Sequence, residues 1–391
     1  MRRLRTQVGI VGAGPAGLTL AHLLHRAGID SVVLEDRTRD YVEHRVRAGV
    51  LEHGTVELLR DAGVGERMDR EGIVHHGISM QFDGERHRIP LSELTDGRAI
   101  VIYGQTEVVK DLIAARLQLG LPLLFEVERV TVRGFDEDAP VIAFRHEDEE
   151  HELSCDVIAG CDGFHGVCRP AIAAALRTFE REYPFAWLGI LADAPPSSEE
   201  LVYTHHDHGF ALLSLRSPDV SRLYLQCRPD EDLDEWPEER IWEELQARTA
   251  LEGWSLETGP ILEQGVTGMR SFVAEPMQCG RLFLAGDAAH IVPPTGAKGL
   301  NLAIADVAVL AQALDRWYRT RDLGSLASYS ETCLRRVWRA EHFSYWMTSM
   351  LHRISDDPFD QKLQLSQLRW VTTSDAAARS LAENYVGLRI A

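Results

Sequence analysis

The chain has 391 residues, of which 45% are hydrophobic and 26% are charged, and these values are ordinary for a globular enzyme with a sizeable core. Its 41 Lys and Arg residues against 60 Asp and Glu residues give a formal net charge of −19, so we expect neither a nucleic-acid nor a membrane partner. The six cysteines lack the spacing of a zinc site or a disulfide scaffold, so we expect no metal and a reduced, cytoplasmic setting.

The N-terminal segment predicts a dinucleotide site. An apolar run leads into the pattern G-x-G-x-x-G, formed by Gly12, Gly14 and Gly17. A helical pattern and a second apolar run follow, and the second run ends at Glu35. In such a unit the glycines allow a tight turn, close approach of a pyrophosphate and packing of helix on strand. The helix N-terminus supplies N–H donors, and the acid can accept from a ribose hydroxyl. The unit predicts binding of FAD or NAD(P).

Two later segments favour FAD. The segment "GCDGFHGVCR" places Asp162 after an apolar run, and "GRLFLAGDAAH" places Asp287 in the same way. An acid beside glycines at the end of a strand suits ribose or ribityl hydroxyls. The next residues, "IVPPTGAKGLN", combine prolines that fix carbonyl directions with glycines that let backbone approach a ring. We therefore expect this stretch to hold the cofactor ring against a substrate.

With "HRVRAGVLEHG", "VIYGQTEV", "EREYPFAWLGILAD" and "ENYVGL", these motifs make the chain resemble the single-component flavin-dependent aromatic hydroxylases over essentially its whole length. The resemblance implies an α/β fold: a Rossmann-like FAD-binding domain, a mostly antiparallel-sheet substrate domain and C-terminal helices. The expected bounds are 1–72, 98–180 and 268–300 for the FAD-binding domain, 73–97 and 181–267 for the substrate domain, and 301–391 for a helical region. The resemblance also implies a homodimer formed through that helical region.

Within this family the chain is most similar to members that hydroxylate 4-hydroxybenzoate. The resemblance implies an enzyme that makes 3,4-dihydroxybenzoate with O2 and NAD(P)H through a flavin C4a-hydroperoxide. Three alternatives stay open at this point. They are a hydroxylase of another hydroxy- or aminobenzoate, a flavin-binding sensor without turnover, and an NAD(P)H oxidase that releases peroxide.

The resemblance assigns the substrate carboxylate to Ser214, Arg216 and Tyr224. Ser214 and Arg216 are two residues apart on an expected strand, so both should face the same side of the sheet. An arginine fork can hold a carboxylate through charge-assisted hydrogen bonds.

At the phenol end, the resemblance assigns proton transfer to Tyr203 and Tyr385, with His75 as the solvent-side end of the path. The hydroxyl group of tyrosine and the imidazole of histidine can form such a relay. Loss of the phenol proton makes the substrate ring more reactive. The Pro294 carbonyl is expected to accept from the substrate hydroxyl, and Thr295 joins the substrate contacts.

The residues assigned to FAD share a position in one of the motifs above. They are Gly12, Gly14, Ala16, Gly17, Glu35, Arg45, Arg47, Gln105, Asp162, Asp287, Lys298, Gly299, Leu300 and Asn301. We expect Lys298 to add positive potential that favours anionic reduced flavin. We expect Asn301 to begin the long helix that follows.

No second G-x-G-x-x-G pattern occurs, so we expect NAD(P)H to bind across a surface cleft. The candidates are Asp36, Arg37, Tyr41, Arg47, His165, Arg169 and Arg270. Asp36 follows Glu35, at a position where NADPH-preferring relatives carry arginine. An acid there repels a 2′-phosphate, so we expect NADH rather than NADPH, although Arg37 and Arg39 could restore NADPH binding.

Overall fold

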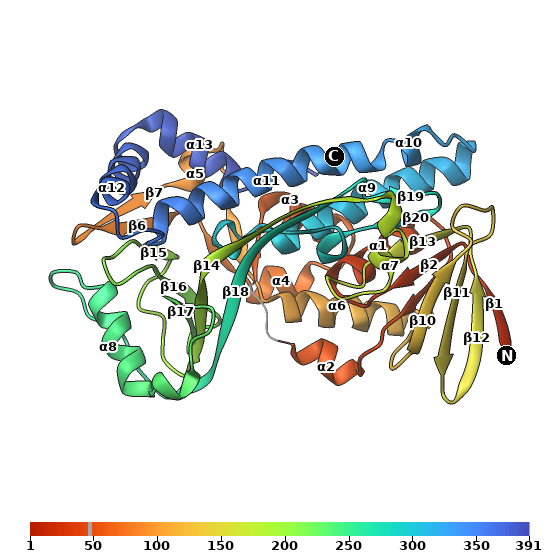
Figure 1. Cartoon of the computed structure of the whole chain (residues 1–391), viewed down its shortest axis with the longest axis horizontal. Coiled ribbons are helices and arrows are strands. Elements are labelled where there is room, and N and C mark those ends of the chain that lie inside the picture. The colour runs from red at the N-terminus through yellow and green to blue at the C-terminus, as the bar shows by residue number, and fades with distance from the viewer. Residues whose placement is uncertain (46–48, 391) are drawn as a thin grey trace.

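The computed structural model describes residues 1–45 and 49–390. Two halves lie side by side along the long axis of the molecule (Figure 1). One half contains the N-terminus and the nucleotide-binding strands, and the other contains most of a large sheet. Two long strands, β14 and β18, run between the halves, and the C-terminal helices extend over both.

The nucleotide-binding half is built on a six-stranded sheet with the order β19-β20-β13-β2-β3-β9. Its strands are β2 (Val8–Val11), β3 (Ser31–Leu34), β9 (Leu123–Leu124), β13 (Val157–Gly160), β19 (Gln278–Cys279) and β20 (Leu282–Leu284). All pairs are parallel except β19 with β20. Parallel sheets need cover on both faces, which explains why all four residues of β2 and of β13 are buried.

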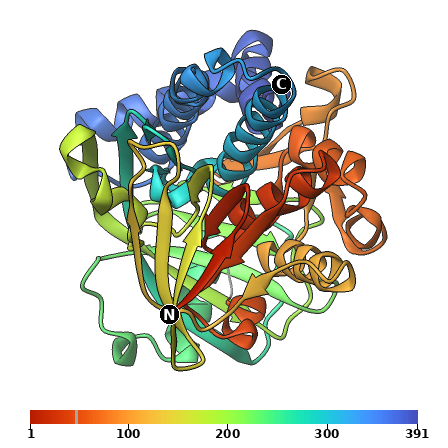
Figure 2. The same ribbon diagram turned by 90° about the vertical axis from the view of Figure 1, so that its right-hand side faces the viewer.

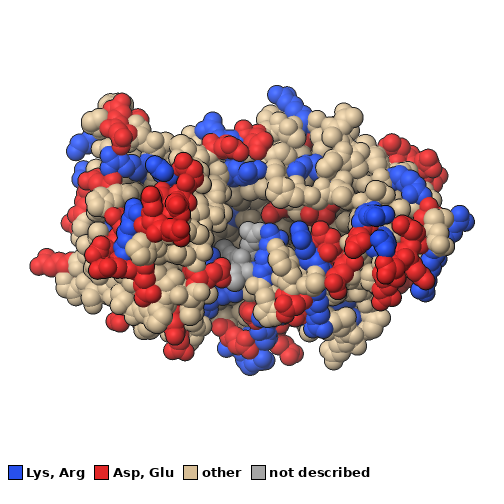
Figure 3. Space-filling view, turned by 60° about the horizontal axis from the view of Figure 1, so that its bottom comes forward, with Lys and Arg blue, Asp and Glu red and all other residues tan. Residues whose placement is uncertain are grey.

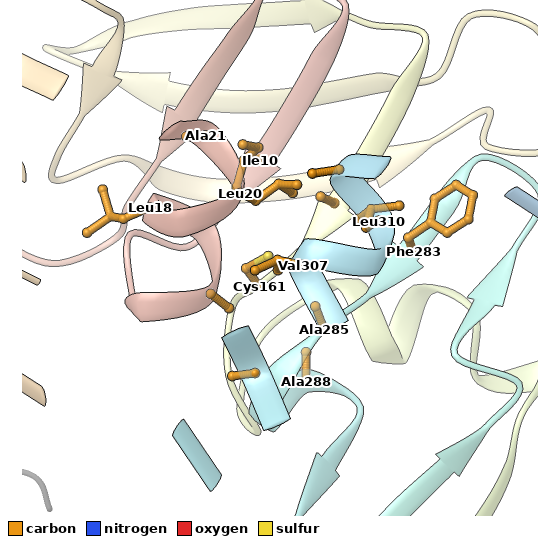
Figure 4. Packing of buried hydrophobic residues seen from close by; sticks show 14 of the residues in the cluster. Ile10, Leu18, Leu20, Ala21, Cys161, Phe283, Ala285, Ala288, Val307 and Leu310 are labelled. Carbon is orange, nitrogen blue, oxygen red and sulfur yellow. The ribbon is translucent and has the colours of Figure 1, made fainter. Parts of the chain in front are cut away.

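Helices cover one face of this sheet. They are α1 (Pro15–Arg26), α6 (Gln105–Gln118) and α9 (Gly299–Thr320), and α1 contacts both others. Figure 4 shows how Ile10 of β2 and Leu20 of α1 meet Val307 and Leu310 of α9 in this core. The apolar faces of the strand and the two helices thus fix the position of the glycine-rich turn that joins β2 to α1.

A four-stranded sheet covers the other face, with the order β1-β12-β11-β10 (Figure 2). Its strands are β1 (Arg2–Arg5), β10 (Glu128–Arg133), β11 (Val141–His146) and β12 (Glu149–Ser154). Ile142 of β11 packs so closely on Gly9 of β2 that a Cβ atom on Gly9 would lie 2.6 Å from the Ile142 Cδ1 atom. The FAD-binding half is therefore layered, as the α/β prediction requires.

The large sheet has eight strands with the order β21-β18-β14-β17-β16-β15-β6-β7. They are β6 (Ile78–Phe82), β7 (Glu85–Ile89), β14 (Arg177–Ala192), β15 (Val202–Thr204), β16 (Ala211–Leu215), β17 (Ser221–Cys227), β18 (Ile261–Glu275) and β21 (His290–Ile291). Every pair is antiparallel except β15 with β6. The prediction of a mostly antiparallel second sheet is confirmed.

Strands β14 and β18 form one ladder from Arg177 opposite Glu275 to Ala192 opposite Ile261. The register shifts between Glu182 and Ala186, where the ladder carries a bulge. The expected domain boundaries near residues 180 and 268 fall inside these two strands, and the division into two domains stays a prediction.

Helices complete both halves. A group at the C-terminal end comprises α10 (Gly324–Ala327), α11 (Tyr329–Leu351), α12 (Pro358–Thr373) and α13 (Asp375–Tyr385), while α8 (Glu238–Arg248) packs on the large sheet. The short helices are α2 (Arg39–His44), α3 (His53–Asp61), α4 (Glu66–Glu71), α5 (Leu91–Leu94) and α7 (Cys168–Ala171). A three-stranded sheet contains β4 (Val50–Leu51), β5 (Ile73–His75) and β8 (Ile100–Ile102). Within the described ranges, no helix is long and apolar enough to cross a membrane, and no group of His, Cys, Asp or Glu could hold a metal ion.

Candidate active site

The three glycines of the first motif have different surroundings. A Cβ atom on Gly12 would lie 2.3 Å from the Cys161 carbonyl oxygen, and one on Gly17 would lie 2.0 Å from the Gly12 carbonyl oxygen. Gly12 also has a φ of +103°, which favours glycine. At Gly14, by contrast, no atom of the described chain would lie within 4 Å of an added Cβ. Packing therefore requires the first and third glycines, and the second borders open space where a ligand can approach.

Glu35 follows β3 beside this turn. Its carboxylate accepts from the backbone N–H of Ala13 at 2.7 Å and of Arg37 at 3.0 Å. Burial raises the pKa of this carboxyl to about 7, against the opposing effect of those two N–H groups. The carboxylate is thus bonded to the backbone of the glycine turn itself, where a ribose hydroxyl of a bound nucleotide could reach it.

The two later acids lie at the same edge of the six-stranded sheet. Asp162 is half-buried, and its Oδ2 atom accepts from the Cys168 N–H at 2.8 Å. Its Oδ1 atom has no hydrogen-bond partner in the part of the chain that the structure describes. Asp287 is exposed, next to Gly286, which packs near Ala16 of α1. A buried oxygen without a donor is costly, so Asp162 suits a ligand hydroxyl. The arrangement fits FAD.

The loop after Pro294 is held by a buried ion pair. The Lys298 Nζ atom donates to Glu52 Oε1 at 2.6 Å and to the carbonyl oxygens of Asn384 and Tyr385 at 2.5 and 3.0 Å. Burial lowers the pKa of Lys298, and the Glu52 carboxylate opposes that effect. The positive potential expected from Lys298 is thus partly neutralised. Sequence reasoning missed Glu52, although it lies in a quoted motif, because 246 positions separate it from Lys298.

Asn301 does not begin the long helix, and that prediction is wrong. Helix α9 starts at Gly299, since the chain turns at Ala297 with a φ of 54° and enters the helix directly. The Asn301 side chain instead donates to the Val50 and Ala297 carbonyl oxygens at 2.9 Å and accepts from the Glu52 N–H at 2.9 Å. It ties the first turn of α9, which also contains the half-buried Leu300, to the segment before α3.

In the described parts of the chain, the remaining residues assigned to FAD have no hydrogen bond, ion pair or ring contact with the acids or the glycine turn described above. Gln105 is the first residue of α6. The Arg45 guanidinium lies over the Tyr41 ring, 5.8 Å from its centroid. Arg47 lies outside the described residues.

Ser214 and Tyr224 share one face of the large sheet. Leu212 pairs with Tyr203 on one side and with Tyr224 on the other, and Ser214 is two residues from Leu212 on β16. The Tyr224 hydroxyl accepts from the Arg222 Nε–H at 3.3 Å. This face therefore carries Tyr203 and two members of the expected carboxylate group.

Arg216 lies one residue beyond β16, which ends at Leu215, so the expectation that it belongs to the strand is wrong. The strand ends because Arg216 turns back, with its N–H bonded to the Val220 carbonyl at 2.9 Å. Its Nη2 atom donates to the Thr106 hydroxyl at 2.6 Å. No carboxylate of the described chain forms an ion pair with it, and burial lowers its pKa. The guanidinium stays charged, because arginine is protonated at any ordinary pH.

The two expected proton-transfer tyrosines are in contact. The Tyr203 hydroxyl on β15 lies 2.5 Å from the Tyr385 hydroxyl at the end of α13, and both side chains are buried. Burial raises the pKa of both hydroxyls. At neutral pH the pair is therefore un-ionised and can pass a proton through its hydrogen bond.

His75 differs from the expectation of a solvent-side residue. It is the last residue of β5, an edge strand that pairs with β8, and its side chain is 0% exposed. Burial lowers the pKa of its imidazole to about 4. Neither ring nitrogen has a hydrogen-bond partner among residues 1–45 and 49–390. The neutral ring is thus a buried group with both nitrogens free for a ligand or proton path.

Pro294 and Thr295 begin the turn before α9. The Pro294 carbonyl accepts from the Ala297 N–H at 2.9 Å, which leaves one lone pair for a substrate hydroxyl. Thr295 is fully buried, and its hydroxyl accepts from Thr348 of α11 at 2.9 Å. The turn is therefore fixed from within and from the helix behind it.

The residues assigned to NAD(P)H form two groups. Phe164 lies at the centre of one: its ring is 4.3 Å from the Arg169 guanidinium, 4.9 Å from that of Arg270, and 5.1 Å from the His165 ring. Sequence reasoning missed Phe164, although it lies inside "GCDGFHGVCR". Arg270 is also 3.7 Å from each of two glutamates, Glu180 and Glu182.

The second group lies at α2. The Arg37 Nε atom is 3.6 Å from Asp36 Oδ1, and its guanidinium lies 5.5 Å from the centroid of the Tyr41 ring. Figure 3 shows a hollow in the middle of one face of the molecule, with Lys and Arg side chains gathered along its rim. Within the described residues, no hydrogen bond, ion pair or ring contact joins the group around Phe164 to the group at α2.

The fold and the site together define a flavoprotein of the aromatic monooxygenase class. The family described as "FAD binding domain" matches residues 5–344. A p-hydroxybenzoate hydroxylase of Acinetobacter baylyi is 48% identical over 99% of this chain and 96% of its own length. The chain belongs to this FAD-binding family and is an FAD-dependent monooxygenase within it.

A more distant relative and a solved structure are also similar to this chain. An aklavinone 12-hydroxylase of Streptomyces purpurascens is 26% identical, and the match covers 76% of this chain and 59% of that protein. The crystal structure of p-nitrophenol 4-monooxygenase from Pseudomonas putida DLL-E4 has the same fold, with a TM-score of 0.86, 19% identity and full coverage of both chains.

Proposed function

We propose that this enzyme hydroxylates 4-hydroxybenzoate to 3,4-dihydroxybenzoate with O2 and NAD(P)H. One observation carries the proposal: a buried Tyr203–Tyr385 hydrogen bond lies beside the same sheet as Arg216, a half-buried arginine without a carboxylate partner in the described chain. A ligand with a phenol at one end and a carboxylate at the other satisfies both. The relative from Acinetobacter baylyi supports this choice of substrate.

The carboxylate is proposed to bind Arg216, with Ser214 and Tyr224 as neutral donors. A buried cation without a counter-charge is unfavourable, so a carboxylate ligand both gains an ion pair and relieves that cost. The aromatic ring would then extend along the sheet toward Tyr203.

The phenol proton is proposed to pass to Tyr203 and then to Tyr385. Because both pKa values are raised, each hydroxyl acts by accepting one proton while donating another, rather than as a tyrosinate base. His75 is the proposed onward acceptor, and the Pro294 carbonyl orients the substrate hydroxyl.

FAD is proposed to bind through Glu35, Asp162, Asp287 and the turn at Gly14. When bound and reduced, FAD supplies the chemistry that activates O2. The chain's part is to hold the ring of the substrate, to remove its proton and to exclude water.

The reductant is proposed to be NADH rather than NADPH. Asp36 follows Glu35 and would repel a 2′-phosphate, although Arg37 lies 3.6 Å from it and weakens that field. His165, Arg169 and Arg270 around Phe164 would supply positive charge for the pyrophosphate.

We also propose a homodimer in the cytoplasm. Large apolar side chains are exposed on the C-terminal helices, namely Trp338 and Tyr345 on α11 and Phe359, Leu363 and Trp370 on α12. Exposed apolar groups of this size favour a protein interface. The six cysteines are all free, which fits a reducing compartment.

The first test is oxidation of NADH and NADPH by the purified, FAD-loaded protein, with and without 4-hydroxybenzoate, with product followed by chromatography. Strong stimulation with formation of 3,4-dihydroxybenzoate is expected. Stimulation with peroxide as the sole product would mean that 4-hydroxybenzoate is an effector and that another hydroxy- or aminobenzoate is the substrate. No stimulation by either reductant would contradict the proposed function.

A further inference from the structure

The guanidinium of Arg216 is held by the half of the molecule that binds the nucleotide. Its Nη2 atom donates to the hydroxyl of Thr106, at the second position of α6, at 2.6 Å. Thr106 is 5% exposed, so water cannot easily take the place of this bond. Across the described ranges, Thr106 is the one hydrogen-bond partner that the guanidinium has, and its other N–H groups are left for a ligand.

Gly104, just before α6, lies directly against the guanidinium of Arg216. A Cβ atom on Gly104 would lie 2.4 Å from Arg216 Nη1 and 2.7 Å from both Cζ and Nη2. These are the three nearest atoms, so an added methyl group would push on the guanidinium first. The backbone of Gly104 has φ −53° and ψ 138°, which any residue adopts. Glycine is therefore needed here for the space it leaves beside Arg216 and not for the turn.

No carboxylate of the described residues forms an ion pair with Arg216, so the nearby Glu107 carboxylate compensates its charge only in part. Glu107, one residue after Thr106, is already paired with Arg67 at 2.5 Å and with Lys110 at 3.0 Å. The N-terminal end of α6 adds its own partial positive charge at the same place. An anion that reaches this point meets both the guanidinium and the helix end.

We propose that Gly104 and Thr106 are positioning residues that orient Arg216 and so make the enzyme specific for phenols that carry a carboxylate. Thr106 occupies one edge of the planar guanidinium, and Gly104 lets it lie flat. The remaining edge is then fixed in the direction of the ligand, as a two-point hold on a carboxylate requires. This inference rests on the proposed function, because it names the determinant of affinity at the same site.

Three variants test it. Thr106→Val keeps the shape of the side chain without the acceptor oxygen, Thr106→Ser keeps the oxygen, and Gly104→Ala moves the guanidinium. Thr249→Val is the matched control, because that threonine is also buried, but it follows α8 directly and its hydroxyl donates to the Leu245 carbonyl of that helix. Binding of 4-hydroxybenzoate and of its neutral amide, 4-hydroxybenzamide, is measured by the change in flavin absorbance.

Thr106→Val and Gly104→Ala are each expected to weaken 4-hydroxybenzoate binding about tenfold, through a raised KM and with little change in kcat. Affinity for the neutral amide should not change. Thr106→Ser should restore most of the affinity, and the control should behave like the wild type. FAD affinity is measured in parallel, and equal FAD affinity separates the effect from a general loss of structure.

Equal losses for the acid and the amide, or no loss for the acid, would overturn the positioning role. If the wild type is not stimulated by 4-hydroxybenzoate, the proposed function fails by itself, and the same variants are then measured with benzoate. A tenfold loss for benzoate would still support the inference, whereas unchanged or undetectable benzoate binding would overturn it.

Discussion

The two ends of the proposed substrate site are built in opposite ways. At the phenol end, Tyr203 and Tyr385 are fully buried and already bonded to each other. At the carboxylate end, Arg216 is half-buried and has a neutral hydroxyl as partner in the described chain instead of an acid. Folding thus forms the hydrogen bond between the two tyrosines of the proposed proton path, but it leaves Arg216 without an ion pair in the described chain. The first end should therefore control reactivity, and the second should control binding.

Arg216→Met tests the carboxylate end most strongly. Loss of the cation should weaken 4-hydroxybenzoate binding on the order of 100-fold, or about 3 kcal/mol, because the ligand carboxylate is left without its counter-charge. The dissociation constant is measured by flavin absorbance. Arg228→Met, at an exposed position after β17, is the control. A change below threefold would place the carboxylate elsewhere.

Tyr385→Phe tests the phenol end. It should keep 4-hydroxybenzoate affinity within about twofold and lower hydroxylation on the order of 100-fold, because the onward route for the proton is lost. Product formed per NADH oxidised is measured by chromatography, with Tyr345→Phe, an exposed tyrosine of α11, as control. Unchanged turnover and coupling would show that Tyr385 carries no proton.

His75 adds a pH dependence to the phenol end. Its pKa is about 4 in the folded protein and 6.5 in the unfolded reference, so below pH 6.5 the unfolded chain binds a proton that the folded chain does not. Stability should fall as the pH falls from 6.5 toward 4, by about 2 kcal/mol at pH 5 from this group. His75→Gln should remove that part of the loss between pH 7 and pH 5.

Urea unfolding at the two pH values measures this difference. His76→Gln is the control, since the neighbouring side chain is exposed. Equal pH dependence in the wild type and His75→Gln would mean that the buried histidine gains no proton on unfolding.

Asp36 extends the comparison to the reductant, because this exposed carboxylate, like the half-buried Arg216, would select a ligand by its charge. Asp36→Arg should raise the ratio of kcat/KM for NADPH to that for NADH about tenfold, since repulsion of a 2′-phosphate becomes attraction. Steady-state rates with both reductants measure the ratio, and Asp40→Arg controls for added positive charge. An unchanged ratio would remove Asp36 from the recognition of the ribose.

Local patterns could be predicted from the sequence, whereas pairings across long separations could not. The turn at Gly12, Gly14 and Gly17 and the acid at Glu35 follow from spacing, because one β–α–β unit fixes them all. The contact of Tyr203 with Tyr385 was expected only through resemblance, since no periodicity relates a strand residue to a helix 182 positions later.

The missed contacts have the same cause. Glu52 with Lys298 and Thr106 with Arg216 join elements that are far apart in the sequence and that only the tertiary packing brings together. The solvent-side position of His75 was expected through the resemblance alone, and no local pattern in the sequence predicts that the packing around β5 buries this side chain. The prediction that α9 begins at Asn301 was wrong because Ala297 adopts a left-handed conformation, and the helix begins two residues earlier, at Gly299.

The continuous ladder of β14 and β18 has a mechanical consequence. Backbone hydrogen bonds tie the region of Arg270 to the strands beside Tyr224, so the two cannot separate without breaking a row of bonds at once. Such a ladder bends most easily where its register shifts, between Glu182 and Ala186 in its middle and between Leu191 and Ala192 at its end. The ladder would therefore couple the proposed reductant cluster mechanically to the proposed substrate sheet. Amide hydrogen exchange should be faster at the two register shifts than in the regularly paired segment between them.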